Sequence, residues 1–164
     1  AEIELYKQRI GGNSDYYGQY EALYKVAEKY SHYNIDSSLV YFEKAVQVAA
    51  DAGDDNLRIS AQIRLSTMLT IGGFYMETAE ILNSVPREAL LASHLAPYYN
   101  AWMTLYRDAY SSSYEPDTFK HDYQDKYGEY RDSLLRVADT MSVYYLHSSI
   151  LDILQEAEYI RKNY

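Results

Sequence analysis

Apolar residues recur along this chain with the spacing of α-helices, and no segment alternates convincingly between apolar and polar positions. A helix from about Asp15 to about Tyr33 is predicted by the stripe Tyr20, Leu23, Tyr24, Ala27 and Tyr30. A second helix follows at once, with the stripe Leu39, Phe42, Ala45, Val46 and Ala49. We expect Asp36 to cap its N-terminus, with Ile35 and Val40 as a hydrophobic staple.

Two glycine junctions divide the next part of the chain. Gly53 ends the second helix, and Asp54 or Asp55 caps a third helix with the buried stripe Ala61, Leu65, Met68 and Leu69. At Gly72-Gly73, a residue without a Cβ can adopt the left-handed conformation that closes a helix. The chain then reverses into a fourth helix, which carries Ala79 and Leu82 and is interrupted at Val85-Pro86. This stretch therefore predicts a helical hairpin.

Three further stripes continue the helical pattern toward the C-terminus. Beyond Pro97, a fifth helix is predicted by Tyr98, Trp102, Leu105, Tyr106 and Ala109. It ends in the loop "SSSYEPD", Ser111 to Asp117. A sixth helix is predicted by Phe119, Tyr123, Tyr127, Tyr130, Leu134 and Val137. The last stripe consists of Val143, Leu146, Ile150, Ile153, Leu154, Ala157 and Ile160.

The spacing of residues in these hairpins is similar to that of tetratricopeptide repeats. The offsets of that repeat are occupied here by Leu65-Ser66, Leu69, Gly73, Tyr75, Thr78 and Leu82. Its second-helix pattern occurs earlier as Ser38, Phe42 and Ala45, after a turn one residue shorter. We predict an all-α fold, a tetratricopeptide-like solenoid of helical hairpins with a right-handed superhelix. One domain over residues 1–164 is expected, with helix pairs at about 14–53, 55–93 and 94–138 and a C-terminal helix at 142–163.

Composition and charge exclude several classes of function. The 164 residues include no cysteine, so disulfides, thiolate metal sites and cysteine nucleophiles are ruled out. With 15 Lys and Arg against 24 Asp and Glu, the formal charge of −9 repels phosphate backbones, and we expect no direct binding of nucleic acid. No apolar run is long enough to span a membrane.

The side chains that could carry chemistry are scattered. The four histidines occur singly, and the nearest approach to a metal-ligand cluster is His121 with Asp122 and Asp125 on a polar, Lys-flanked segment, which is more typical of a solvated helix face. The serines from Ser111 to Ser113 lack the Gly-x-Ser-x-Gly elbow of a nucleophile. We therefore predict no metal, no cofactor and no enzymatic activity.

A closer resemblance rests on the order of several longer segments. These are "YKQRI" near the start, Tyr30-Ser31-His32-Tyr33 before "NIDSSLVYFEKA", "GDDNLRISAQIRLSTMLTIGGFYMETAEIL" and "EYRDSLLRV". Together they resemble the N-terminal region of membrane-tethered transcriptional regulators of Bacteroidales with tetratricopeptide-like repeats. In that family the region is exported and precedes a membrane helix, a coiled coil and a DNA-binding helix-turn-helix. The resemblance implies a sensor part in the periplasm or cell envelope, while the residues alone leave the cytoplasm open.

The repeat register also predicts a binding groove. In tetratricopeptide arrays the first helix of each pair lines the groove, which implies Tyr24, Glu28, His32, Ile63, Thr67, Tyr99 and Met103 as its residues. The 21 tyrosines fit this interpretation, because a rigid aromatic ring offers much contact area at a small entropic cost. Packing between helices explains most of them equally well.

These residues predict a module that binds a protein or peptide partner or senses a ligand. The alternative is part of a carbohydrate-binding surface lipoprotein built on similar helices, with glycan as its ligand. The sequence does not indicate the oligomeric state. It does place Trp102 on the buried stripe of the fifth helix, with Tyr99 and Met103 about a third of a turn away and exposed.

Overall fold

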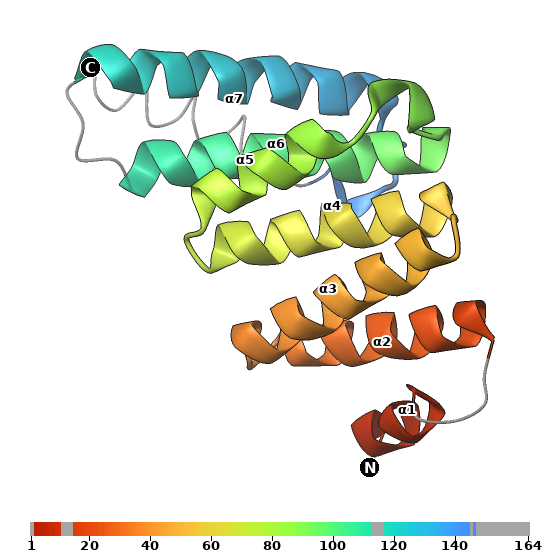
Figure 1. The fold of residues 1–164 in the computed structure, drawn as a ribbon. Helices are drawn as coiled ribbons and strands as arrows, with labels where there is room; N and C mark the ends of the chain where they lie inside the picture. The colour runs from red at the N-terminus through yellow and green to blue at the C-terminus, as the bar shows by residue number, and fades with distance from the viewer. Residues whose placement is uncertain (1, 11–14, 113–116, 145, 147–164) are drawn as a thin grey trace. The chain divides into compact units, whose positions relative to one another are not determined.

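The computed structural model describes residues 2–10, 15–112, 117–144 and 146. These residues form seven α-helices, without a β-strand among them, as the all-α prediction requires (Figure 1). The elements are, in chain order, α1 (Glu2–Ile10), α2 (Tyr16–Tyr30), α3 (Ile35–Asp51), α4 (Asp55–Ile71), α5 (Tyr75–Ser84), the short 3₁₀ helix η1 (Arg87–Ala89), α6 (Ala92–Ser112) and α7 (Asp117–Val137).

The chain divides into two units, Ala1–His94 and Leu95–Tyr164. This division falls within one residue of the predicted boundary between the second and third helix pairs. The proposal that the whole chain is one domain, and the right-handed superhelix, stay predictions. The C-terminal helix expected at 142–163 lies outside the described residues, apart from residues 142–144 and 146.

In the first unit each helix packs on the next along the chain, from α1 to α5. The pairs α2–α3 and α4–α5 are antiparallel hairpins with short turns (Figure 1). Polar side chains begin these helices as caps: Asp15 accepts the Gly18 N–H at 2.8 Å, and Asp54 accepts the Leu57 N–H at 3.0 Å. The prediction that Asp54 or Asp55 caps the third helix is thus confirmed.

The predicted start of α3 is wrong by two residues. Asn34, and not Asp36, is its N-cap and accepts the Ser37 N–H at 2.9 Å. Asp36 instead lies in the first turn, where its charge favours the helix dipole. The predicted staple between Ile35 and Val40 is also wrong, because Val40 is 46% exposed.

Both hairpins close in the same way, through a pair of small buried residues. In α2–α3 the Ser38 hydroxyl donates to the Ala27 carbonyl oxygen at 2.9 Å. In α4–α5 the Thr78 hydroxyl lies 3.4 Å from the Ser66 carbonyl oxygen. Side chains this small let two helix backbones approach closely, and their recurrence is the structural signature of the repeat.

α4 ends at a glycine that adopts the left-handed backbone conformation. Gly73 has φ +82°, and the Phe74 N–H bonds to the Leu69 carbonyl oxygen at 2.9 Å, which together close the helix in a Schellman motif. Gly53 ends α3 in the same way at φ +70°. The predicted left-handed conformation of Gly73 is confirmed.

Replacing Gly73 by valine should therefore cost about 1–2 kcal/mol of the free energy of unfolding, because a side chain resists this conformation. No atom lies within 4 Å of a Cβ built at Gly73, so the cost comes from backbone strain at positive φ and not from a steric clash with neighbouring atoms. Gly128 is the matched control: it lies in α7, also with open space around a Cβ, and G128A should stabilise by about 0.5–1 kcal/mol. Chemical denaturation followed by circular dichroism measures both, and equal effects would contradict the assignment.

The second unit is built on the pairing of α6 and α7. Its core contains Met103, Tyr127 and Leu134, all buried, and Trp102 stacks on Tyr130 with ring centroids 5.2 Å apart. The predicted burial of Trp102 is confirmed. α6 begins at Ala92, ahead of the predicted start beyond Pro97, and contains Pro97 in its second turn at the loss of one helical hydrogen bond.

α1 is an element that the sequence pattern did not predict. It packs on α2, where Glu2 pairs with Lys29 at 3.0 Å and the Lys7 ammonium lies 5.6 Å from the centroid of the Tyr30 ring. No residue of α1 is buried, so its apolar periodicity is too weak to reveal a helix.

Candidate functional site

The face of the first unit that best fits a binding site is formed by one stripe of half-buried and exposed residues on each first helix. We call Glu21, Lys25, Glu28 and His32 the α2 stripe, and Ser60, Arg64, Thr67 and Ile71 the α4 stripe. Their spacing of three and four residues places each set on one side of its helix, with His32 in the turn after α2. Each α4 position lies 39 residues after its α2 counterpart, so the stripes are equivalent within the repeat.

The two stripes end together at an open depression of about 610 Å³. Its lining comes from the α2–α3 turn and the start of α3, residues 31–36, and from Ile71 at the end of α4. His32 and Ile71 are thus brought together although they are 39 residues apart. Ile71 and Tyr33 are 54% and 67% exposed, which leaves an apolar surface open beside polar groups.

The predicted groove residues of the first unit divide into two groups. Glu28, Thr67 and His32 lie on the stripes, and His32 lines the depression. Ile63 is buried, and Tyr24 is half-buried with its ring 5.2 Å from that of Phe42 in an edge-to-face contact. The exposure expected of Ile63 is therefore wrong, because its side of α4 packs into the core, whereas the next residue, Arg64, is half-buried.

The predicted groove residues of the second unit are less accessible still. Met103 is completely buried, and the expectation that it is an exposed contact residue is wrong. Tyr99 is half-buried and packs against the same cluster, 6.4 Å from the Tyr130 ring. Whether Tyr99 contacts a ligand stays a prediction.

Five stripe residues were missed from sequence: Glu21, Lys25, Ser60, Arg64 and Ile71. Lys25 pairs with Glu28 at 3.2 Å. The Arg64 guanidinium carbon lies 5.8 Å from the centroid of the Phe42 ring. The equivalence of positions 39 residues apart was the signal that could have found them.

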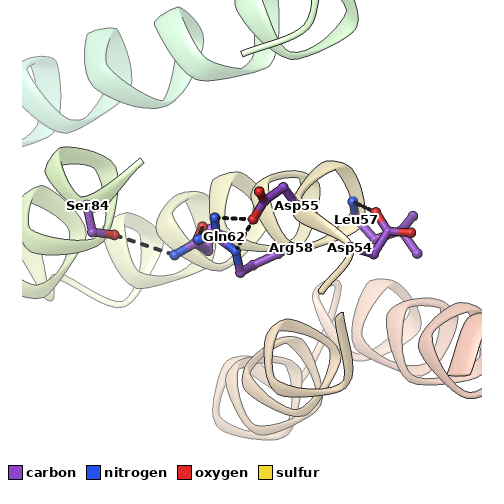
Figure 2. A network of polar contacts seen from close by, with 6 residues as sticks. All are labelled: Asp54, Asp55, Leu57, Arg58, Gln62 and Ser84. Atoms are coloured by element: carbon purple, nitrogen blue, oxygen red, sulfur yellow. Dashed lines mark hydrogen bonds and ion pairs between the residues drawn. The ribbon is translucent and has the colours of Figure 1, made fainter. Parts of the chain in front are cut away.

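A separate polar network runs along α4 (Figure 2). Arg58 donates to Asp55 at 2.6 Å and to Gln62 at 3.2 Å, and the Gln62 amide reaches the Ser84 hydroxyl of α5 at 3.4 Å. These contacts tie the start of α4 to the end of α5. The acidic pair Asp54 and Asp55 is thereby occupied in capping and ion pairing.

Other kinds of site find little support in the described part of the chain. No three His, Cys, Asp or Glu side chains converge there closely enough to hold a metal ion, and His121 and Asp125 are exposed. None of the helices in the same ranges combines the length and apolar character that crossing a bilayer requires.

His94 is the buried histidine of the first unit, 4% exposed. Its Nδ1 accepts the Leu91 N–H at 3.1 Å, and its Nε2 lies 3.1 Å from the Ser60 hydroxyl, so the ring is neutral with its proton on Nε2. Burial lowers the pKa of His94 below its usual value, against the opposing effect of a hydrogen bond to the Asn56 backbone. His94 thus joins the start of α6 to α4.

Acid should therefore destabilise the protein through His94. Its folded pKa lies below the unfolded value of about 6.5, so its contribution is complete above that pH and is lost as the pH falls through the folded pKa. H94Q places an amide near the position of Nε2, where it can keep the contact with Ser60, and it does not titrate. The difference in free energy of unfolding between wild type and H94Q should shift against the wild type from about pH 7.5 to about pH 5. A difference that is independent of pH would contradict this assignment.

Helical hairpins that repeat with equivalent small residues at their crossings define a protein of the tetratricopeptide-repeat class. Within that class, the family model described as the SusR N-terminal TPR domain matches residues 1–162, and the chain belongs to this family. This confirms the resemblance to regulators with tetratricopeptide-like N-terminal regions. No curated protein and no solved structure matches the chain. Domains of this class commonly mediate protein interactions and are generally non-catalytic.

Proposed function

We propose that this chain is a non-enzymatic module that binds a protein or peptide partner along the α2 and α4 stripes. The observation that carries the proposal is the depression at which the two stripes end, with His32 and Ile71 both in its lining. Exposed apolar side chains beside polar groups suit a partner segment better than bulk water. The acidic balance of the chain argues against nucleic acid and anionic lipid as the occupant.

By resemblance to the family, the module is the exported sensor part of a larger bacterial regulator, located in the periplasm or cell envelope. Binding at the stripes would then be the event that the regulator senses. A glycan ligand remains the alternative, for which the aromatic residues are the natural contacts.

A photo-crosslinking amino acid at position 32 tests the proposal in the native cell. We expect a covalent adduct with one polypeptide, because His32 is exposed in the depression. The same amino acid at Ala50, an exposed position of α3 outside both stripes, is the control and should give no such adduct. Adducts of equal yield at both positions, or none at position 32, would count against a protein partner at this face.

A further inference from the structure

Arg64 is a cation without an acidic partner on the α4 stripe. Among the described residues no carboxylate forms an ion pair with it, and its Nε is buried without a hydrogen-bond partner. The Phe42 ring holds the guanidinium in place at 5.8 Å. A buried donor that lacks a partner is costly to the fold, and in a chain with 24 acidic residues its isolation calls for a physical reason.

The equivalent position of the preceding repeat, Lys25 of α2, has the carboxylate partner that Arg64 lacks. There Lys25 pairs with Glu28, three residues further along α2, at 3.2 Å. In α4 the residue at that offset is Thr67, whose hydroxyl donates to the Ile63 carbonyl oxygen at 3.1 Å. The α4 stripe therefore keeps the cation of the repeat and lacks its carboxylate.

We infer that Arg64 anchors a carboxylate side chain of a bound peptide, and that the depression beside Ile71 receives a large apolar residue of the same peptide. This rests on the proposed function and names the chemistry of the partner. A guanidinium offers a planar fork of donors that matches a carboxylate in two parallel hydrogen bonds. The exposed surfaces of Ile71 and Tyr33 offer the apolar contact.

The distance between the two anchors sets the spacing in the peptide. Arg64 and Ile71 are seven residues apart on one face of α4, which corresponds to roughly 10 Å along the axis. An extended peptide with three residues per turn rises about 9 Å over three residues and returns to the same side. The acidic and apolar residues of the partner should therefore lie three positions apart.

Selection from a random peptide library displayed on phage, with the complete 164-residue chain as bait, tests this inference. Enriched sequences should carry Asp or Glu three positions from an aromatic or branched aliphatic residue. For a synthesised peptide of this kind, R64M should weaken binding by roughly tenfold to a hundredfold, as for loss of a charged hydrogen-bonded pair. Changing the acid of the peptide to its amide should have the same effect on wild type and little effect on R64M.

K29M is the control, since Lys29 lies on α2 outside both stripes and has its own carboxylate in Glu2 at 3.0 Å. It should leave the affinity for the peptide nearly unchanged. R64M should unfold at the wild-type temperature or above it, because methionine keeps the apolar stem and removes the unpartnered donor. R64K keeps the positive charge but lacks the planar set of donors. It is a second test variant and should weaken peptide binding less than R64M does.

The possible failures have different meanings. If no peptide is enriched on the wild-type chain, the proposed peptide-binding function fails and this inference fails with it. If peptides are enriched without an acidic residue, or bind R64M as well as wild type, the carboxylate anchor is wrong while peptide binding stands. A large drop in the melting temperature of both R64M and R64K would show a structural role for Arg64 and overturn the inference. Concentration-dependent self-association that R64M abolishes would show that a second copy is the occupant.

Discussion

Replacing Trp102 by alanine is expected to remove about 3–5 kcal/mol of the free energy of unfolding, a large part of the stability of an ordinary domain. Trp102 is buried, and its ring stacks on Tyr130 at 5.2 Å and on Tyr106 at 5.8 Å, with interplanar angles of 9° and 16°. Alanine would leave a cavity beside Tyr106 of α6 and Tyr130 of α7, whose rings also stack on each other at 5.8 Å, and both tyrosines would lose their contact area with the indole.

W102F is the matched control for this substitution. Phenylalanine keeps a ring in the stack and removes an indole N–H that has no hydrogen-bond partner, so it should cost much less than alanine. Trp102 is the only tryptophan, and its emission in the folded protein should be blue-shifted and poorly quenched by iodide. Readily quenched, red-shifted emission would place Trp102 on the surface and contradict the assignment.

F42A should have an effect of similar size in the first unit, also about 3–5 kcal/mol. Phe42 is completely buried in the cluster that joins α2, α3 and α4, which contains Ala27, Leu65, Met68 and Leu69. Its ring also receives the edge of Tyr24 and the guanidinium of Arg64. Alanine at this position therefore creates a cavity and removes the support of a stripe residue at once.

F42L distinguishes lost volume from lost aromatic character. Leucine fills most of the space, and it should cost less than about 1.5 kcal/mol if packing dominates. Urea denaturation followed by far-ultraviolet circular dichroism measures both variants. A loss below about 1 kcal/mol in F42A would show that the cluster collapses around the cavity and that Phe42 is not central to it.

Most helices and turns of the first unit could be predicted because their signals are local. The α4–α5 turn needs a residue that tolerates positive φ, and Gly73 supplies it within the same short stretch. The N-terminus of α4 needs a side-chain acceptor, and Asp54 lies next to it in sequence. Where two local candidates competed, as Asn34 and Asp36 did for α3, the sequence could not decide between them. The turn geometry after Tyr30 selected Asn34.

Which residues of α6 are buried was decided by the tertiary structure, because apolar residues lie on more than one side of this helix. In α6, five consecutive residues, 101–105, are buried, so the side of the helix cannot be inferred from period alone. Met103 lies a third of a turn from Trp102, and it is buried because Tyr127 and Leu134 of α7 cover that side too. Periodicity reports which residues are apolar, and it does not report which neighbour covers them.

In the candidate site, too, some features follow from local sequence signals and others only from contacts between helices. The repeat register, the turns and the place of His32 in the turn after α2 follow from the sequence, because each depends on spacing along one helix or hairpin. Two features depend on which residues of separate helices come within reach: His32 and Ile71 line one depression, and no carboxylate among the described residues pairs with Arg64. Distances across helices are set by the packing of buried side chains such as Ala27 and Phe42, and only the tertiary structure determines them.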